Sequence, residues 1–293
     1  MGRGSTTLDL LAEAASGLAE VIDGVLRARA CLLPDGHRAL DGVAQCRLDL
    51  FLRCLPGGHR GLAVFHRFDG VPDASAAIHL KPATQLAERV LLPGDPHRAL
   101  AVAQELTEQP KMFNHHRGLW GYTGVARDGE LLTIQATGMG GPSAAIVVEE
   151  LIALGARTFI RIGTCGALTG THGLGEIVAP AAALALDGTS RALGADTRVL
   201  PDPQLAAACA VDAPSVVAAS VDLFYGDPDT AGAEVVEMEC ATLFQVAKLR
   251  GVRAAALLGV SDVLLSERVR IDPEGLEAIG LRLGEAAWAA LTR

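Results

Sequence analysis

"TGMGGPSAAIVVEELIALGARTFIRIGTCGA", residues 137–167, contains in one stretch the elements that predict the fold. The glycines at 138–141 predict a turn, and Pro142 suits the first turn of a helix. The apolar face that follows predicts a helix over 142–155, and the apolar run 158–163 predicts a strand. A strand, a helix and a second strand in succession are typical of an α/β domain.

The same alternation continues on both sides of this stretch. It favours a three-layer α/β/α domain over residues 76–293, built on a mixed, twisted central sheet. Ligands of such sheets usually bind at the carboxyl ends of strands. Further strands are expected at 89–93, 131–137, 176–181, 215–221, 235–238 and 254–261, and further helices at 97–107, 202–210, 239–250 and 273–291.

Residues 1–75 have a different character from the rest of the chain. Apolar residues at helical spacing predict an amphipathic helix over 7–33. Residues 34–75 are rich in Gly, Pro, His and Arg and predict loops. We expect an N-terminal extension with a structural or oligomer-contact role.

Composition excludes several classes of protein. The chain has 293 residues, half of them hydrophobic, and a net charge of −9, which argues against a general nucleic-acid binder. The sequence contains no uninterrupted run of about 18 apolar residues, so no membrane span is expected. Acidic residues within 1–30 interrupt the apolar core that a signal peptide would need. The six scattered cysteines show no CxxC spacing, so reduced thiols in a cytoplasmic protein are expected, without a metal site.

The segment "RVLLPGDPHRA", residues 89–99, places Gly94 and Arg98 where a buried strand turns into a helix. Glycine lets a ligand approach the backbone, and the start of a helix offers free N–H groups. Arg98 adds a forked donor suited to phosphate oxygens. An anion site is one interpretation, and an ordinary strand–helix turn is the other.

Arg161 lies inside an apolar strand, where an unpaired guanidinium would cost several kcal/mol. Its partner could be a structural carboxylate or a bound phosphate. Thr164 offers a hydroxyl at the expected end of this strand.

Carboxylates gather at two other strand ends. Glu237 and Glu239 flank Met238 and face the same side if the strand continues. Such carboxylates can accept sugar hydroxyls, although a solvated helix start is the plainer interpretation. Asp262 ends the apolar strand of "GVSDVL".

Taken in order, these motifs resemble the trimeric and hexameric nucleoside phosphorylases, which include bacterial purine nucleoside phosphorylases and uridine phosphorylases. The resemblance spans roughly residues 77–262, with a weaker tail to 293. The motifs are "RVLLPGDPHRA", "NHHRGLWGYTG", residues 137–167, "DLFY", "VVEMECATL" and "GVSD".

The resemblance implies a role for each matching residue. Arg161 and Asp262 would be catalytic, with Asp262 donating a proton to N7 of the leaving purine, and His79 and Arg117 would reach into a neighbouring subunit. Phosphate would be bound by Gly94, Arg98, Arg117, Arg161 and Thr164; ribose by His79, Met139, Met238 and Glu239; and the base by Phe224, Val236, Glu237 and Asp262.

The implied reaction is phosphorolysis of purine ribo- or deoxyribonucleosides, with inorganic phosphate as co-substrate and no cofactor. The implied assembly is a homo-oligomer with shared sites, usually a hexamer of three dimers. Purines are favoured because "GDPDTAGAE", residues 226–234, lacks the Gln and Arg that uridine phosphorylases place there. A uridine phosphorylase, a phosphate-independent nucleosidase and a non-catalytic nucleoside-binding homologue are the alternatives. The arginine that assists Asp262, Arg268 or Arg270, is left open.

Overall fold

The computed structural model describes residues 77–226, 229–230 and 232–293, so the extension predicted over residues 1–75 lies outside the described part. The helices are α3 (Pro96–Leu106), α4 (Gly141–Ala153), α5 (Gly188–Ala192), α6 (Pro203–Cys209), α7 (Cys240–Arg250) and α8 (Pro273–Leu291), with the 3-10 turn η2 (His116–Gly118). The strands are β1 (Arg89–Leu92), β2 (Thr107–Asn114), β3 (Gly121–Ala126), β4 (Leu131–Gln135), β5 (Thr158–Ala167), β6 (Ile177–Ala185), β7 (Arg198–Val199), β8 (Ser215–Ser220), β9 (Val235–Glu237), β10 (Arg253–Leu264) and β11 (Arg268–Arg270).

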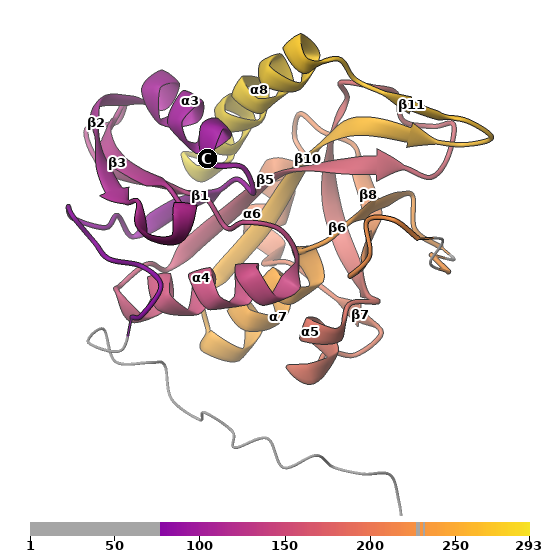
Figure 1. The fold of residues 1–293 in the computed structure, drawn as a ribbon, viewed down its shortest axis with the longest axis horizontal. Coiled ribbons are helices and arrows are strands. Elements are labelled where there is room, and N and C mark those ends of the chain that lie inside the picture. The colour runs from indigo at the N-terminus through magenta and orange to yellow at the C-terminus, as the bar shows by residue number, and fades with distance from the viewer. Residues whose placement is uncertain (1–76, 227–228, 231) are drawn as a thin grey trace, which may run out of the picture. The chain divides into compact units, whose positions relative to one another are not determined.

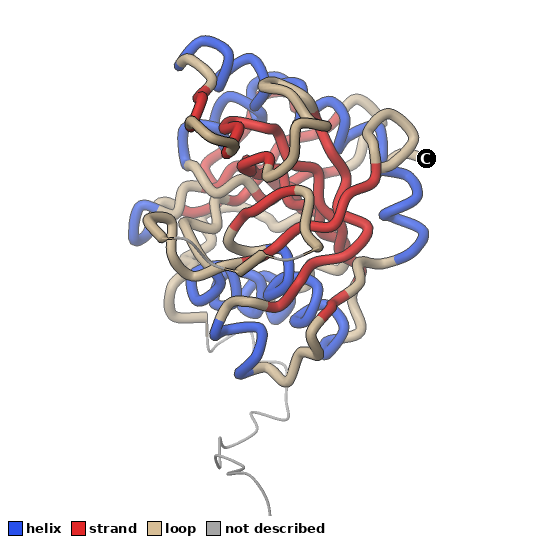
Figure 2. Tube along the Cα trace, turned by 90° about the vertical axis from the view of Figure 1, so that its right-hand side faces the viewer, coloured by secondary structure: helices blue, strands red, loops and turns tan. Residues whose placement is uncertain are grey.

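These strands form one mixed sheet between two layers of helices (Figure 1), as the sequence predicts. Helices α3, α6 and α8 cover one face, and α4, α5 and α7 cover the other. Figure 2 shows the strands as the inner layer of the domain. The three-layer α/β/α prediction is confirmed.

Alternation along the central strands explains why both faces are covered. In β1, Val90 and Leu92 pack into the core under α4 and α7, while Leu91 packs into the core under α3 and α8. In β10, Ala256 packs into the first of these cores and Leu257 into the second. A strand whose successive side chains are all apolar needs a helix layer on each side.

Five strands at one end of the sheet close into a ring. β5 pairs in parallel with β10, β10 antiparallel with β6, and β6 in parallel with β8. β8 then pairs in parallel with β9, and β9 returns antiparallel to β5. The closure places β9 beside the second half of β5.

The sequence did not predict the strands β2, β3, β7 and β11. β2 is an edge strand whose pairing with β3 shifts register twice, and it contains Gln109 at φ 45° followed by Pro110. These interruptions and its charged side chains remove the alternation that marks a strand. Within the described residues, no helix is both long enough and apolar enough to cross a membrane.

Three predicted strand ends were placed too early, one of them that of β6, which continues to Ala185 rather than ending at residue 181. β5 continues to Ala167 rather than ending at Gly163, and β10 continues to Leu264. A Cβ on Gly163 would lie 2.6 Å from Arg161 Nη2, so this glycine makes room for the guanidinium rather than ending the strand. Thr164 is therefore inside β5, not beyond it.

Candidate active site

One cavity of about 830 Å³ collects the residues that follow or end several strands. Its walls come from the turn after β1, the turn after β4, the second half of β5, residues 221–226, β9 and the end of β10. Among its lining residues are eleven of those singled out in the sequence: Gly94, Arg98, Met139, Arg161, Thr164, Phe224, Val236, Glu237, Met238, Glu239 and Asp262.

Arg98 reaches this cavity from the first turn of α3. Asp95 is the N-cap of that helix, and its carboxylate accepts from the N–H of His97 at 3.0 Å. Arg98 Nη1 donates to the carbonyl of Ile162 at 3.3 Å, and no carboxylate in the described part of the chain forms an ion pair with it. Burial lowers the pKa of Arg98 from its ordinary value, and the charge of Arg161 lowers it further, against the opposing effect of Asp95. The turn therefore contains a partly buried cation that pairs with no carboxylate of the described residues.

Arg161 does have carboxylate partners, which answers the question left open by the sequence. Its Nε lies 3.2 Å from Glu237 Oε2, and its Nη2 bonds Glu239 Oε2. Burial disfavours its charge, but Glu239 and Glu237 raise the pKa of Arg161 above its ordinary value. Its Nη1 is buried without a hydrogen-bond partner. One donor of this guanidinium is thus left for another acceptor.

The two glutamates differ in how far their oxygens are already used. Glu237 accepts from Ser220 Oγ at 2.5 Å and from the backbone N–H groups of Glu239 and Cys240 at 2.8 and 3.0 Å. It fixes the start of α7. Glu239 accepts from the backbone N–H of Gly140 at 2.5 Å, besides its contact with Arg161. Burial, the largest influence, raises the pKa of Glu239 above its ordinary value, with a further rise from Glu237. The solvated helix start considered for this segment is wrong, because both side chains are buried.

Asp262 lies at a bulge near the end of β10. The pairing with β5 shifts register between Val260 and Asp262, so Ser261 is an extra residue in that ladder. The carboxyl of Asp262 accepts from Ser261 Oγ at 2.8 Å and from Arg268 Nε at 2.7 Å, and Arg270 Nε lies 3.0 Å away. Both arginines left open by the sequence therefore contact Asp262.

Arg268 also contacts the aromatic wall of the cavity. Its guanidinium carbon lies 4.9 Å above the ring centre of Phe224. Phe224 packs edge-on against Tyr225, with ring centres 5.0 Å apart. The sequence did not single out Arg268 over Arg270, yet only Arg268 lines the cavity. The alternation of "SERVRI", residues 266–271, is the signal that could have predicted a strand here.

His79 and Arg117 do not line the cavity of their own subunit. His79 Nδ1 lies 2.7 Å from Glu150 Oε1 on α4. Arg117 is exposed in η2, with a left-handed φ of 59°. The structure therefore separates these two residues from the other predicted site residues.

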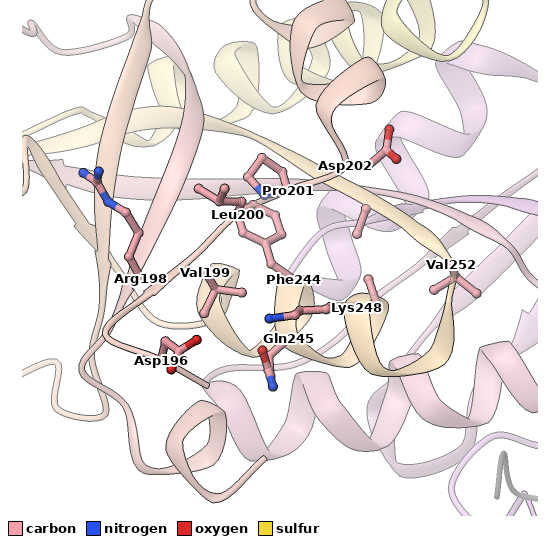
Figure 3. Close-up of a pocket in the computed structure, with 12 residues that line it drawn as sticks. Asp196, Arg198, Val199, Leu200, Pro201, Asp202, Phe244, Gln245, Lys248 and Val252 are labelled. Atoms are coloured by element: carbon pink, nitrogen blue, oxygen red, sulfur yellow. The ribbon is translucent and has the colours of Figure 1, made fainter. Parts of the chain in front are cut away.

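A second cavity, of about 370 Å³, lies beside α7 and the segment 196–202 (Figure 3). Phe244 and Val199 line it together with the polar side chains of Asp196, Gln245 and Lys248. None of the residues predicted from the sequence lines it, so the larger cavity is the candidate active site.

Comparison with known proteins agrees with this geometry. The chain belongs to the phosphorylase superfamily, which residues 88–278 match. It is 36% identical over 207 residues to a protein named purine nucleoside phosphorylase DeoD-type from Geobacillus kaustophilus, covering 65% of this chain and 87% of that relative. Proteins of the same name from Clostridium beijerinckii and Alkaliphilus metalliredigens are 35% and 34% identical, over 66% and 69% of this chain and 89% and 96% of theirs.

Proposed function

We propose that this protein is a pentosyltransferase that cleaves purine nucleosides with inorganic phosphate, releasing the free base and ribose or deoxyribose 1-phosphate for nucleoside salvage. One observation carries the proposal: Arg98 and Arg161 line one cavity, and Arg161 has a buried nitrogen without a partner. The names of the similar proteins support the choice of purine nucleosides.

Phosphate is the anion that suits this pair of arginines. The charge of Arg161 lowers the pKa of Arg98, so an anion bound between the two guanidinium groups would stabilise the charged form of Arg98. We assign Gly94, Arg98, Arg161 and Thr164 as the ligands of phosphate, with the hydroxyl of Thr164 donating. The positions of the donors are fixed by β5 and α3 before phosphate arrives, so little reorganisation is needed.

The ribose is assigned to Met139, Met238 and Glu239. An ionised carboxylate can accept about four hydrogen bonds, and Glu239 uses part of this capacity for Gly140, Met238 and Arg161. Its remaining lone pairs can accept the hydroxyls of a sugar. Held between this carboxylate and phosphate, the C1′ carbon would be placed for attack.

The base is assigned to Phe224, Val236 and Asp262. Phe224 offers a ring face. Glu237 forms part of the wall but has little capacity left for a ligand, because its oxygens already accept from four donors. In the proposed step the glycosidic bond breaks, its electron pair goes to the purine, and N7 receives a proton from Asp262. A phosphate oxygen then bonds C1′, whose developing positive charge the phosphate stabilises.

We propose shared sites because two of the assigned residues lie outside the cavity of their own subunit. We assign His79 and Arg117 to the site of a neighbouring subunit, where they would contact ribose and phosphate. The proposed assembly is a dimer with shared sites, three of which form a hexamer. We place the enzyme in the cytoplasm, which the free thiols of Cys165, Cys209 and Cys240 suit, and the reaction needs no cofactor.

The test is base release from inosine, adenosine and uridine, each with and without inorganic phosphate. We expect release from a purine nucleoside only when phosphate is present, and a loss of about 100-fold or more in Asp262→Ala. Release from uridine alone would make the enzyme a uridine phosphorylase. Release without phosphate would indicate a nucleosidase, and binding without release would indicate a non-catalytic homologue.

A further inference from the structure

A single carboxylate holds the segment that contains His79. Glu150 is on α4, is 7% exposed, and accepts from the backbone N–H of Ile78 at 3.0 Å and of Leu80 at 2.7 Å. The N–H of His79 lies 3.0 Å from Oε2 and 3.1 Å from Oε1. Three consecutive backbone donors on one side chain leave this segment little freedom to turn.

The same carboxylate sets the chemistry of the His79 ring. Burial opposes the ionisation of Glu150, but hydrogen bonds from the His79 ring and from the three backbone N–H groups hold its pKa below the usual value. An ionised carboxylate only accepts, so Nδ1, 2.7 Å from Oε1, must be the donor. In the neutral ring Nε2 is then an acceptor. The imidazole thus offers a lone pair suited to a hydroxyl.

Hydrogen bonds join the His79 segment to the turn that contains Arg117. His116 Nδ1 lies 3.1 Å from the carbonyl oxygen of His79. Asn114 accepts from the N–H of Lys81 at 2.8 Å and donates to the carbonyl of Leu119 at 2.5 Å. The segments of His79 and Arg117 therefore belong to one hydrogen-bonded unit that begins at Glu150. Neither residue lines the cavity of its own subunit.

We propose that Glu150 is a positioning residue for the reaction: it holds His79 with Nε2 as an acceptor for a ribose hydroxyl in the site of a neighbouring subunit. The proposal rests on the proposed function and adds a residue that touches neither substrate. It predicts that Glu150 acts in trans, on the cavity of the other subunit and not on its own.

The first test is Glu150→Gln in the full chain, with steady-state kinetics in nucleoside and in phosphate. A Gln amide can donate to Nδ1, which would then become the acceptor and move the ring proton to Nε2. We expect KM for the nucleoside to rise about 10-fold, the effect of one hydrogen bond, with KM for phosphate unchanged. Equal changes in both constants would overturn the proposal.

His79→Asn is the matched variant. Its amide can still donate to Glu150, but it lacks the atom at Nε2. We expect the same rise in nucleoside KM with an unchanged midpoint of thermal unfolding. This variant keeps the proposal testable if Glu150→Gln does not fold, because an unchanged nucleoside KM in His79→Asn would overturn it.

Mixed oligomers test action in trans. Glu150→Gln and Arg98→Ala chains, each with a different tag, are co-expressed and the doubly tagged oligomers purified. The Glu150→Gln cavity would receive an intact His79 unit from the Arg98→Ala subunit, so we expect the wild-type nucleoside KM to return. If wild type is active and the mixture shows only the raised KM, this inference fails while the proposed function stands. If wild type itself gives no phosphorolysis, the proposed function fails.

Discussion

Arg268 donates from Nε to Asp262 Oδ1 over 2.7 Å, across the hairpin formed by β10 and β11. In the register of that hairpin, however, Asp262 lies directly opposite Arg270, whose Nε is 3.0 Å from the same oxygen. The more exposed Arg270 side chain does not line the cavity. The residue that reaches the aromatic wall is therefore the diagonal neighbour and not the direct one.

Replacing Arg268 should cost more activity than replacing Arg270. Arg268→Met removes both the bond to Asp262 and the stacking on Phe224, whereas Arg270→Met removes only a shared ion pair. We expect kcat/KM for a purine nucleoside to fall about 10-fold or more for Arg268→Met and less than 3-fold for Arg270→Met. Equal losses in the two variants would show that the stacking contact has no role.

Arg98→Gln should act on phosphate and little on the nucleoside. Arg98 has no carboxylate partner in the described residues, so its removal leaves no buried acid unpaired. Loss of a hydrogen bond to a charged group predicts a rise in KM for phosphate of about 10- to 100-fold. Initial rates over a range of phosphate concentrations measure this. An unchanged KM for phosphate would remove Arg98 from the phosphate site.

Arg161→Ala should damage stability as well as activity. The substitution leaves the buried carboxylates of Glu237 and Glu239 without their cation. Removing one partner of a buried ion pair costs about 3–5 kcal/mol. We therefore expect a large fall in the free energy of unfolding together with the loss of turnover. Urea unfolding followed by circular dichroism measures the first effect. A fully stable but inactive variant would mean that the glutamates find other partners.

The stabilising effect of Glu150 should depend on pH. Its pKa is lowered in the folded state, so its contribution is complete above the ordinary value of 4.5 and is lost as pH falls through the folded pKa. The free energy of unfolding of wild type should exceed that of Glu150→Gln at neutral pH, and the difference should shrink below pH 4.5. Urea titrations of both chains over this range measure it. A difference independent of pH would contradict the ionised state assigned to Glu150.

The sequence predicted most of the cavity because its residues follow strands with strong apolar patterns. Gly94 and Met139 could be placed on this basis, since they follow β1 and β4, and the ends of adjacent parallel strands meet at one edge of a sheet. The edge strand β2 could not, because Gln109 and Pro110 interrupt it. The alternation of apolar and polar residues marks a strand only where one of its faces is buried, and few side chains of an edge strand such as β2 are buried.

Pairing between distant side chains was harder to predict. The sequence indicated that Arg161 needed a partner, but the choice of Glu237 and Glu239 depends on β9 returning antiparallel beside β5. Likewise, the contacts of Arg268 and Arg270 with Asp262 depend on the antiparallel pairing of β11 with β10. Both outcomes are set by sheet register, which a single sequence specifies only weakly.

The closed ring of five strands also has a consequence for how the enzyme is made. β5 and β10 are neighbours in the ring, yet Thr158 pairs with Arg253 and Gly166 with Asp262, across almost 100 residues of intervening chain. Contacts between such distant segments form late in folding, because a long loop must close first. During synthesis the residues that we propose as phosphate ligands, Gly94, Arg98, Arg161 and Thr164, emerge from the ribosome well before Asp262. Arg161 must also wait for its partners Glu237 and Glu239, so the site would be complete only after β10 has been synthesised.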